Sequence, residues 1–150
     1  MLKKLWGHPA HPVFVHFPIA FFTLASLLVF LHVLDRKSKR ISRFLKKIRV
    51  GDLNLESFSF LANLLGFGMG LVAIFSGLEL VDGWRHLPLP HGPLGIATVS
   101  CYFILLVMRW VFGPAVHDKG RLTTFYYVLH LVGLLLVGLT GHAGADLHYG

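Results

Sequence analysis

The stretch VFVHFPIAFFTLASLLVFLHVL, residues 13–34, decides the fold of this chain. Its length is close to the about 20 apolar residues that a helix needs to cross about 30 Å of hydrocarbon. Three more apolar runs of this kind lie at 57–81, 93–112 and 123–141. Because 55% of the residues are hydrophobic and only 14% are charged, too little polar surface remains for a water-soluble domain. The sequence therefore predicts one transmembrane domain over residues 1–150, an all-α, up-and-down four-helix bundle in the membrane.

The basic residues indicate how this bundle is oriented. Eight of the fourteen Lys and Arg residues lie between Arg36 and Arg49, directly after the first apolar run. Cytoplasmic loops of membrane proteins are enriched in Lys and Arg, so this loop is predicted to be inside and both termini periplasmic, in a bacterial inner membrane. Lys119 and Arg121 in the third loop agree. The net charge of +7 follows from this topology, and it indicates the lipid bilayer rather than nucleic acid as the partner.

Residues 38–49 are predicted to form a short amphipathic helix on the cytoplasmic face. The apolar positions repeat at helical spacing, with Lys and Arg between them: Ile41, Phe44, Leu45 and Ile48. This pattern is typical of a helix that lies on a lipid surface, and docking of a cytoplasmic partner is the alternative. At the same face, Arg109 is expected to snorkel to the interface, and Tyr126 and Tyr127 are expected to lie in the interfacial aromatic belt.

A stripe of small residues follows the second apolar run. Its members are three or four positions apart and share one helix face: Ala62, Gly66, Gly70, Ala73 and Gly77. A neighbouring helix that packs closely through a Gly-x-x-x-Gly contact is one interpretation. The other interpretation is a flat cofactor that lies against Gly66, Gly70 and Gly77.

Seven of the ten histidines are predicted at the periplasmic end, although they come from four separate stretches: His8, His11, His16, His86, His91, His142 and His148. Neutral imidazole is the commonest metal ligand and also an axial ligand of haem iron. An ionisable side chain such as that of His16 costs about 2 kcal/mol or more inside an apolar run unless it is paired or bound.

We expect four of these histidines to converge on haem iron or on a metal ion: His11, His16, His91 and His142. His86 is a weaker candidate, and His8 and His148 are expected to be bystanders. Glu79 and Asp82 end the second run and are candidate proton acceptors, since a carboxylate at an apolar boundary can have a tuned proton affinity.

A second, deeper haem would need further histidines on the same helix faces. His32 lies about 160° around an ideal helix from His16, and His130 lies about 120° from His142. Neither pair shares a face, so an outer site is favoured and a second haem is left open. His130 is expected to hydrogen-bond within the bundle, with ligation as the weaker alternative.

Two motifs give the chain a family resemblance. Residues 11–18 read His-Pro-Val-Phe-Val-His-Phe-Pro, and residues 141–144 read Gly-His-Ala-Gly. On these motifs the chain resembles a family of small bacterial predicted membrane proteins that is known only as a domain of unknown function. The resemblance spans nearly the whole chain, and it implies roles for an acidic residue after the second helix, here Asp82, and for a histidine near the third, here His91.

Segments related to this family also occur in longer proteins beside Rieske or cytochrome-type domains, which implies electron transfer. The leading hypothesis is therefore a b-type cytochrome-like protein with haem b that exchanges electrons between quinol and a periplasmic carrier or other membrane subunits. The second is a non-haem transition-metal site, with Asp82 joining the four histidines. The third is a structural or assembly subunit. Cys101 is the only cysteine, so there is no Cys-x-x-Cys-His motif for covalent haem attachment.

Overall fold

The computed structural model of the chain describes residues 4–5, 8–9, 11–47, 54–81 and 88–149. Helices dominate them, and two short paired strands, β1 (Lys4–Leu5) and β2 (His8–Pro9), precede the first helix. The helical elements are α1 (His11–Lys37), α2 (Lys39–Lys47), α3 (Leu55–Leu80), α4 (His91–Phe112), the 3-10 helix η2 (Gly113–Asp118) and α5 (Arg121–Tyr149). Four of them are long and apolar enough to cross a membrane, which confirms the predicted all-α membrane bundle.

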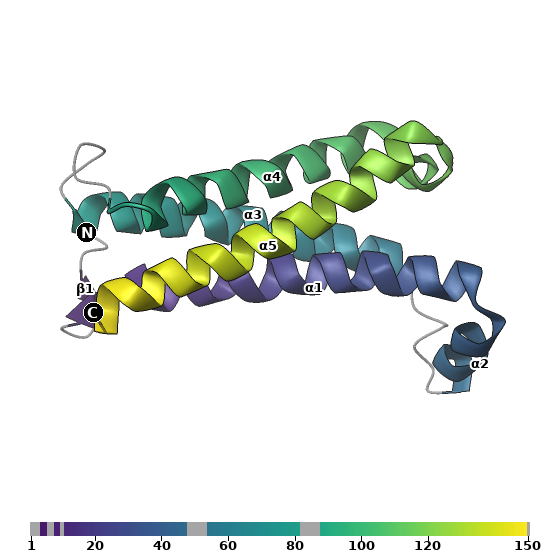
Figure 1. The fold of residues 1–150 in the computed structure, drawn as a ribbon, viewed down its shortest axis with the longest axis horizontal. Coiled ribbons are helices and arrows are strands. Elements are labelled where there is room, and N and C mark those ends of the chain that lie inside the picture. Colours follow the sequence, from purple (N-terminus) through teal and green to yellow (C-terminus); the bar gives the residue numbers. More distant parts are fainter. Residues whose placement is uncertain (1–3, 6–7, 10, 48–53, 82–87, 150) are drawn as a thin grey trace.

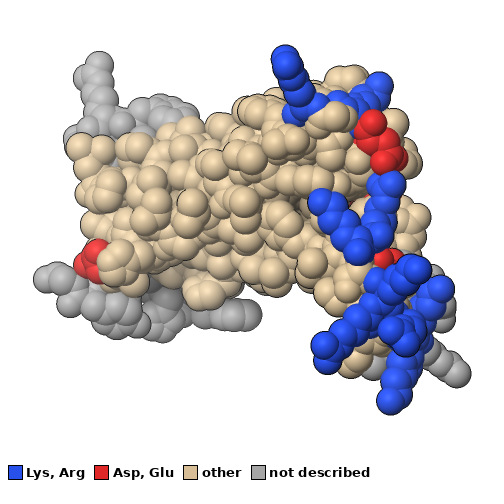
Figure 2. Space-filling view, turned by 45° about the vertical axis from the view of Figure 1, so that its right-hand side comes forward, with Lys and Arg blue, Asp and Glu red and all other residues tan. Residues whose placement is uncertain are grey.

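The four long helices run up and down, as Figure 1 shows. They follow one another around the bundle in the order α1, α3, α4 and α5, so each helix is antiparallel to its neighbours. One end of the bundle carries the starts of α1 and α4 and the finish of α5, whereas the other end carries α2 and η2. Figure 2 shows Lys and Arg gathered at the α2 end. We call this the basic end, and the opposite end the histidine end.

The centre of the bundle is built on close contacts between aromatic rings and glycines. Phe22 of α1 stacks on Tyr102 of α4 with 4.0 Å between ring centroids, and both are fully buried. A Cβ atom on Gly66 would lie 2.6 Å from Phe22, and one on Gly70 would lie 2.9 Å from Val99. The glycine stripe of α3 therefore lets the side chains of α1 and α4 approach, as the helix-packing interpretation expects.

Buried hydroxyl groups link three of the four long helices. Ser26 of α1 lies 2.8 Å from the Tyr102 hydroxyl of α4 and 2.9 Å from Nδ1 of His130 on α5. All three residues are fully buried. His130 thus hydrogen-bonds within the bundle, as expected. Because hydrocarbon offers no water to these groups, each must find its partner on a neighbouring helix.

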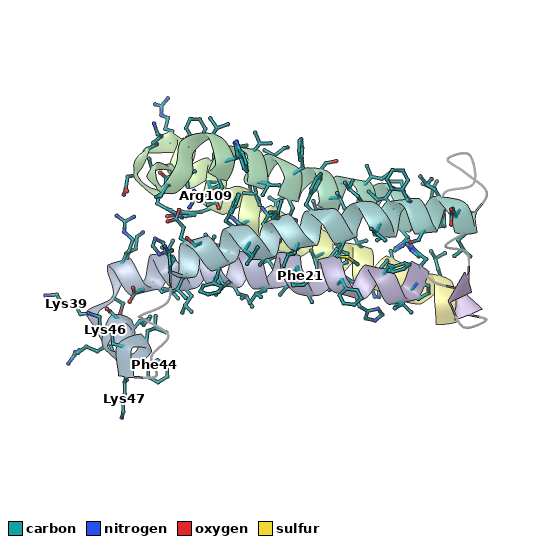
Figure 3. The ribbon with its side chains drawn as sticks, turned by 180° about the vertical axis from the view of Figure 1, so that it is seen from behind. Phe21, Lys39, Phe44, Lys46, Lys47 and Arg109 are labelled. Carbon is teal, nitrogen blue, oxygen red and sulfur yellow. The ribbon has the colours of Figure 1, made fainter. Side chains whose placement is uncertain are left out.

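The amphipathic helix is α2, which is slightly shorter than the predicted 38–49. Leu45 is buried and holds α2 against the bundle, while Phe44 is 60% exposed. The basic side chains point away from α1, as Figure 3 shows for Lys39, Lys46 and Lys47. The remainder of the predicted segment, residues 48–49, lies outside the described residues.

Replacing Gly66 with alanine tests the packing of the stripe. We expect Gly66→Ala to lower the free energy of unfolding by about 1–3 kcal/mol, because its Cβ would overlap the Phe22 ring. Gly68→Ala is the matched control, since nothing lies within 4 Å of that Cβ position. Unfolding in mixed micelles, followed by circular dichroism, measures both. Equal stabilities of the two variants would contradict this packing.

Candidate functional site

His11 is the first residue of α1 and points into the histidine end of the bundle. Its Nδ1 atom lies 2.9 Å from the Ala73 carbonyl oxygen and 3.1 Å from the Ser76 hydroxyl, both on α3. A carbonyl oxygen can only accept, so Nδ1 donates to it, and in the neutral ring the lone pair is on Nε2. A Cβ on Gly77 would lie 3.0 Å from this ring, so glycine leaves the space that the imidazole fills.

His91 is held in the same way on the other side of the bundle. It begins α4, and its Nδ1 donates to the Thr140 carbonyl oxygen of α5 over 3.1 Å. A Cβ on Gly144 would lie 2.9 Å from its ring. Each imidazole therefore has a carbonyl partner at Nδ1 and a glycine at its edge, and each keeps Nε2 without a hydrogen bond to a described residue.

The His11 and His91 rings lie close together in an edge contact. Their centroids are 6.0 Å apart and their planes meet at 81°. Two imidazoles on opposite sides of one metal ion, with bonds of about 2.0–2.1 Å, have centroids roughly 6 Å apart. Metal-bound histidines usually donate their second ring nitrogen to a carbonyl or carboxylate, which fixes the ring orientation and raises its basicity. The distance between the two ring centroids and the hydrogen bonds at Nδ1 are those expected of two histidines that hold one ion.

The other two predicted ligands lie elsewhere. His16 is exposed on the surface of α1, where its Nδ1 contacts the Pro12 carbonyl oxygen. Its side chain points about 140° away from His11 on an ideal helix, so it cannot enter the same space. His142 is also exposed, with 78% of its side chain accessible, and lies 3.7 Å from Asp146. The structure therefore brings together His11 and His91 but neither His16 nor His142.

Of the remaining candidates Glu79, Asp82 and His86, only Glu79 lies among the described residues. Glu79 lies in the last turn of α3, partly buried at the histidine end. Asp82 and His86 fall outside the described residues. Within the described ranges, no group of three or more His, Cys, Asp or Glu side chains is arranged to hold a metal ion. Only a two-histidine site is therefore visible there.

A cluster of polar side chains at the basic end was not predicted from the sequence. We call it the basic-end cluster, and its members come from five elements: His32, Glu56, Arg109, His117 and Tyr127. Arg109 Nε lies 2.8 Å from Glu56 Oε1 and His117 Nε2 lies 3.4 Å from the same oxygen, although neither contact is aligned as a hydrogen bond. Nδ1 of His117 lies 2.8 Å from the Tyr127 hydroxyl, and the ring of His32 packs on that of His117.

This cluster corrects two expectations for the cytoplasmic face. Arg109 does not snorkel: its side chain is only 15% exposed, because Glu56 attracts it into the bundle. Tyr126 is buried within the bundle and not presented to lipid, and its ring packs between those of His117 and His130. Tyr127 is partly buried, and its hydroxyl lies 2.8 Å from His117. The signal was present in the sequence, since Glu56 and Arg109 have opposite charges next to the same end of neighbouring spans.

Comparison with known proteins gives one finding. A family model described as "Predicted membrane protein (DUF2231)" matches residues 7–150. None of the curated proteins and none of the solved structures matches the chain.

Loss of the Glu56 carboxylate should destabilise the bundle strongly. Glu56→Gln leaves the charge of Arg109 buried without a counter-ion, which costs about 3–5 kcal/mol in the free energy of unfolding. Asp118→Asn is the matched control, because its partner Arg36 is half exposed and such pairs contribute about 0–1 kcal/mol.

Both variants can be compared by unfolding in mixed micelles. The double variant Glu56→Gln/Arg109→Gln should recover part of the loss, since it removes both buried charges. If Glu56→Gln were as stable as Asp118→Asn, the ion pair would not hold this end of the bundle together.

Proposed function

The chain belongs to the DUF2231 family of predicted membrane proteins, and we propose that it is a b-type cytochrome-like electron-transfer protein of the membrane. In this proposal His11 and His91 are the residues that would hold one haem b at the histidine end. The observation that carries it is the close pair of imidazoles, with 6.0 Å between ring centroids and each ring oriented by a backbone carbonyl at Nδ1.

The number of ligands favours haem over a bare metal ion. A porphyrin supplies four nitrogen ligands of its own, so the protein needs to add only the two axial ones. A structural or catalytic zinc site takes three or four protein ligands. The described residues supply two, and both present an Nε2 lone pair. Haem iron bound in this way would cycle between its ferric and ferrous states, which is the chemistry of electron transfer.

The protein's own residues have three tasks in this function. His11 and His91 fix the position and orientation of the iron ligands, because their Nδ1 atoms are held by Ala73 and Thr140. Gly77 and Gly144 leave the space beside the rings. Glu79, partly buried at the same end, is the carboxylate that we assign to proton uptake if quinol is the electron donor.

The charge distribution supports an orientation. Lys and Arg gather at the basic end (Figure 2), so this end would face the cytoplasm and the His11–His91 pair the periplasm. A haem at that position could exchange electrons with quinol in the inner membrane and with a periplasmic carrier or a neighbouring membrane subunit.

The absorption spectrum of the purified protein tests the proposal. After expression with sufficient haem, we expect a Soret band and sharp bands on reduction. His11→Ala or His91→Ala should abolish them, because each removes one axial ligand.

His16→Ala and His142→Ala are the matched controls and should keep the spectrum, since these side chains point away from the pair. Stoichiometric metal without porphyrin would replace the proposal by a non-haem site. Absence of both from the folded wild-type protein would leave a structural or assembly role.

A further inference from the structure

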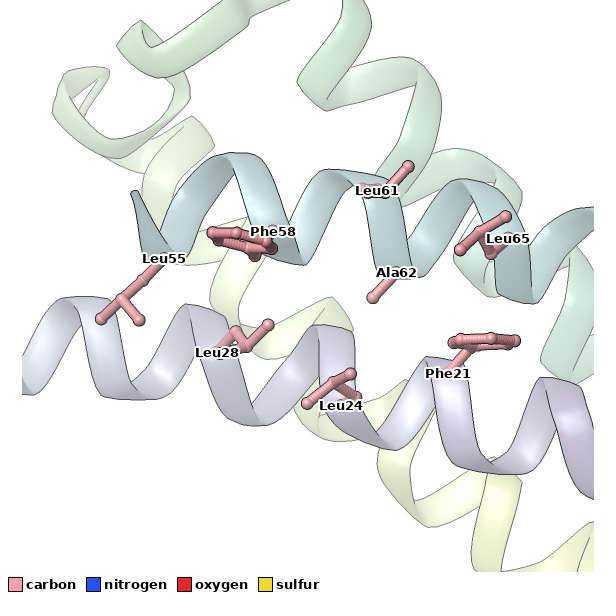
Figure 4. Close-up of a pocket in the computed structure, with 8 residues that line it drawn as sticks. All are labelled: Phe21, Leu24, Leu28, Leu55, Phe58, Leu61, Ala62 and Leu65. Atoms are coloured by element: carbon pink, nitrogen blue, oxygen red, sulfur yellow. The ribbon is translucent and has the colours of Figure 1, made fainter. Parts of the chain in front are cut away.

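An apolar groove runs along the seam between α1 and α3, and Figure 4 shows its lining. Its volume is about 310 Å³, and every side chain that lines it is apolar: Phe21, Leu24, Leu28, Leu55, Phe58, Leu61, Ala62 and Leu65. Leu24 and Phe58 are 45% and 48% exposed, so the groove opens onto the outer surface of the bundle. In a membrane this surface contacts lipid, and an elongated hydrocarbon chain is the ligand that such a lining accommodates.

The groove begins beside the basic helix α2. Leu55, which lines it, is the first residue of α3, and only residues 48–54 separate Leu55 from the end of α2. Figures 1 and 3 both place α2 at this end of α1. The burial of Leu45 keeps α2 against the bundle. The helix α2 and the mouth of the groove therefore lie at the same end of the bundle.

The positive charge of α2 favours a lipid with an anionic headgroup. Five of its nine residues are Lys or Arg and none is acidic: Lys39, Arg40, Arg43, Lys46 and Lys47. A cluster of this size beside a membrane span attracts anionic headgroups, whereas zwitterionic or uncharged ones gain little from it. An apolar groove and a strongly basic helix thus lie at the same end of the bundle.

We propose that α2 and the α1–α3 groove form a specific binding site for one anionic phospholipid. One acyl chain lies in the groove, and the phosphate group is held by the basic residues of α2. The site is distinct from the His11–His91 pair at the opposite end of the bundle, and it does not depend on a cofactor.

Native mass spectrometry of the full-length protein, with lipid removed and then titrated back, tests the site. We expect one phosphatidylglycerol molecule to be retained at least tenfold more tightly than phosphatidylcholine. Leu24→Trp and Leu65→Trp fill the groove from different helices and should abolish this binding. Lys46→Gln/Lys47→Gln should reduce the affinity for phosphatidylglycerol by roughly tenfold, because each lysine near the phosphate is worth about fivefold at most.

Two control variants separate the site from the general lipid surface. Val107→Trp adds the same bulk to an exposed position of α4 that lines a smaller apolar depression. Lys119→Gln/Arg121→Gln removes the same charge from the basic end without touching α2. Both should bind phosphatidylglycerol like the wild type, and circular dichroism checks that every variant is folded.

Several outcomes would overturn the proposal. Equal retention of phosphatidylglycerol and phosphatidylcholine would show a non-selective lipid surface. Competition by inorganic phosphate alone would show an anion site on α2 without a chain in the groove. Displacement of the lipid by a quinone would assign the groove to the quinone tail. Loss of binding in either control variant would place the lipid elsewhere.

Discussion

The structure depends on one constraint: a polar group inside the hydrocarbon layer costs free energy unless it is paired within the bundle. The Ser26 hydroxyl of α1 is paired in this way, because it is hydrogen-bonded to Tyr102 of α4 and to His130 of α5. At the basic end, Glu56 links α3, α4 and η2 through its charge contacts with Arg109 and His117. Apolar contacts alone would leave the helices free to rotate against one another, whereas these pairs fix which face of each helix points inward.

The rotation of the helices also decides which histidines meet. His11 lies about 20° from Phe22 around an ideal helix, and His91 lies about 20° from Tyr102. Because Phe22 and Tyr102 stack in the centre of the bundle, His11 and His91, three helical turns toward the histidine end, are directed into the bundle as well. His16 lies about 120° from Phe22 and is therefore exposed. The central contacts thus position the proposed ligand pair.

The sequence was sufficient to predict the fold, because four apolar runs and one basic loop allow few arrangements. It also placed His11 and His91 at the same end. It did not show that His16 and His142 point outward, since this depends on how neighbouring helices are rotated. Helical phase relative to buried residues such as Phe22 would have separated His11 from His16. The Glu56–Arg109 pair was missed because each residue, taken alone near the end of a span, is typical of an interface.

In the proposed function, His11 and His91 would hold one haem iron, and their imidazole planes meet at 81° in this structure. Electron paramagnetic resonance of the oxidised, purified protein at low temperature tests it most directly, because the low-spin ferric signal depends on the angle between axial imidazoles. We expect a low-spin signal of the strongly anisotropic type that perpendicular planes produce. A high-spin signal, a low-spin signal typical of parallel imidazoles, or no ferric haem signal would contradict it.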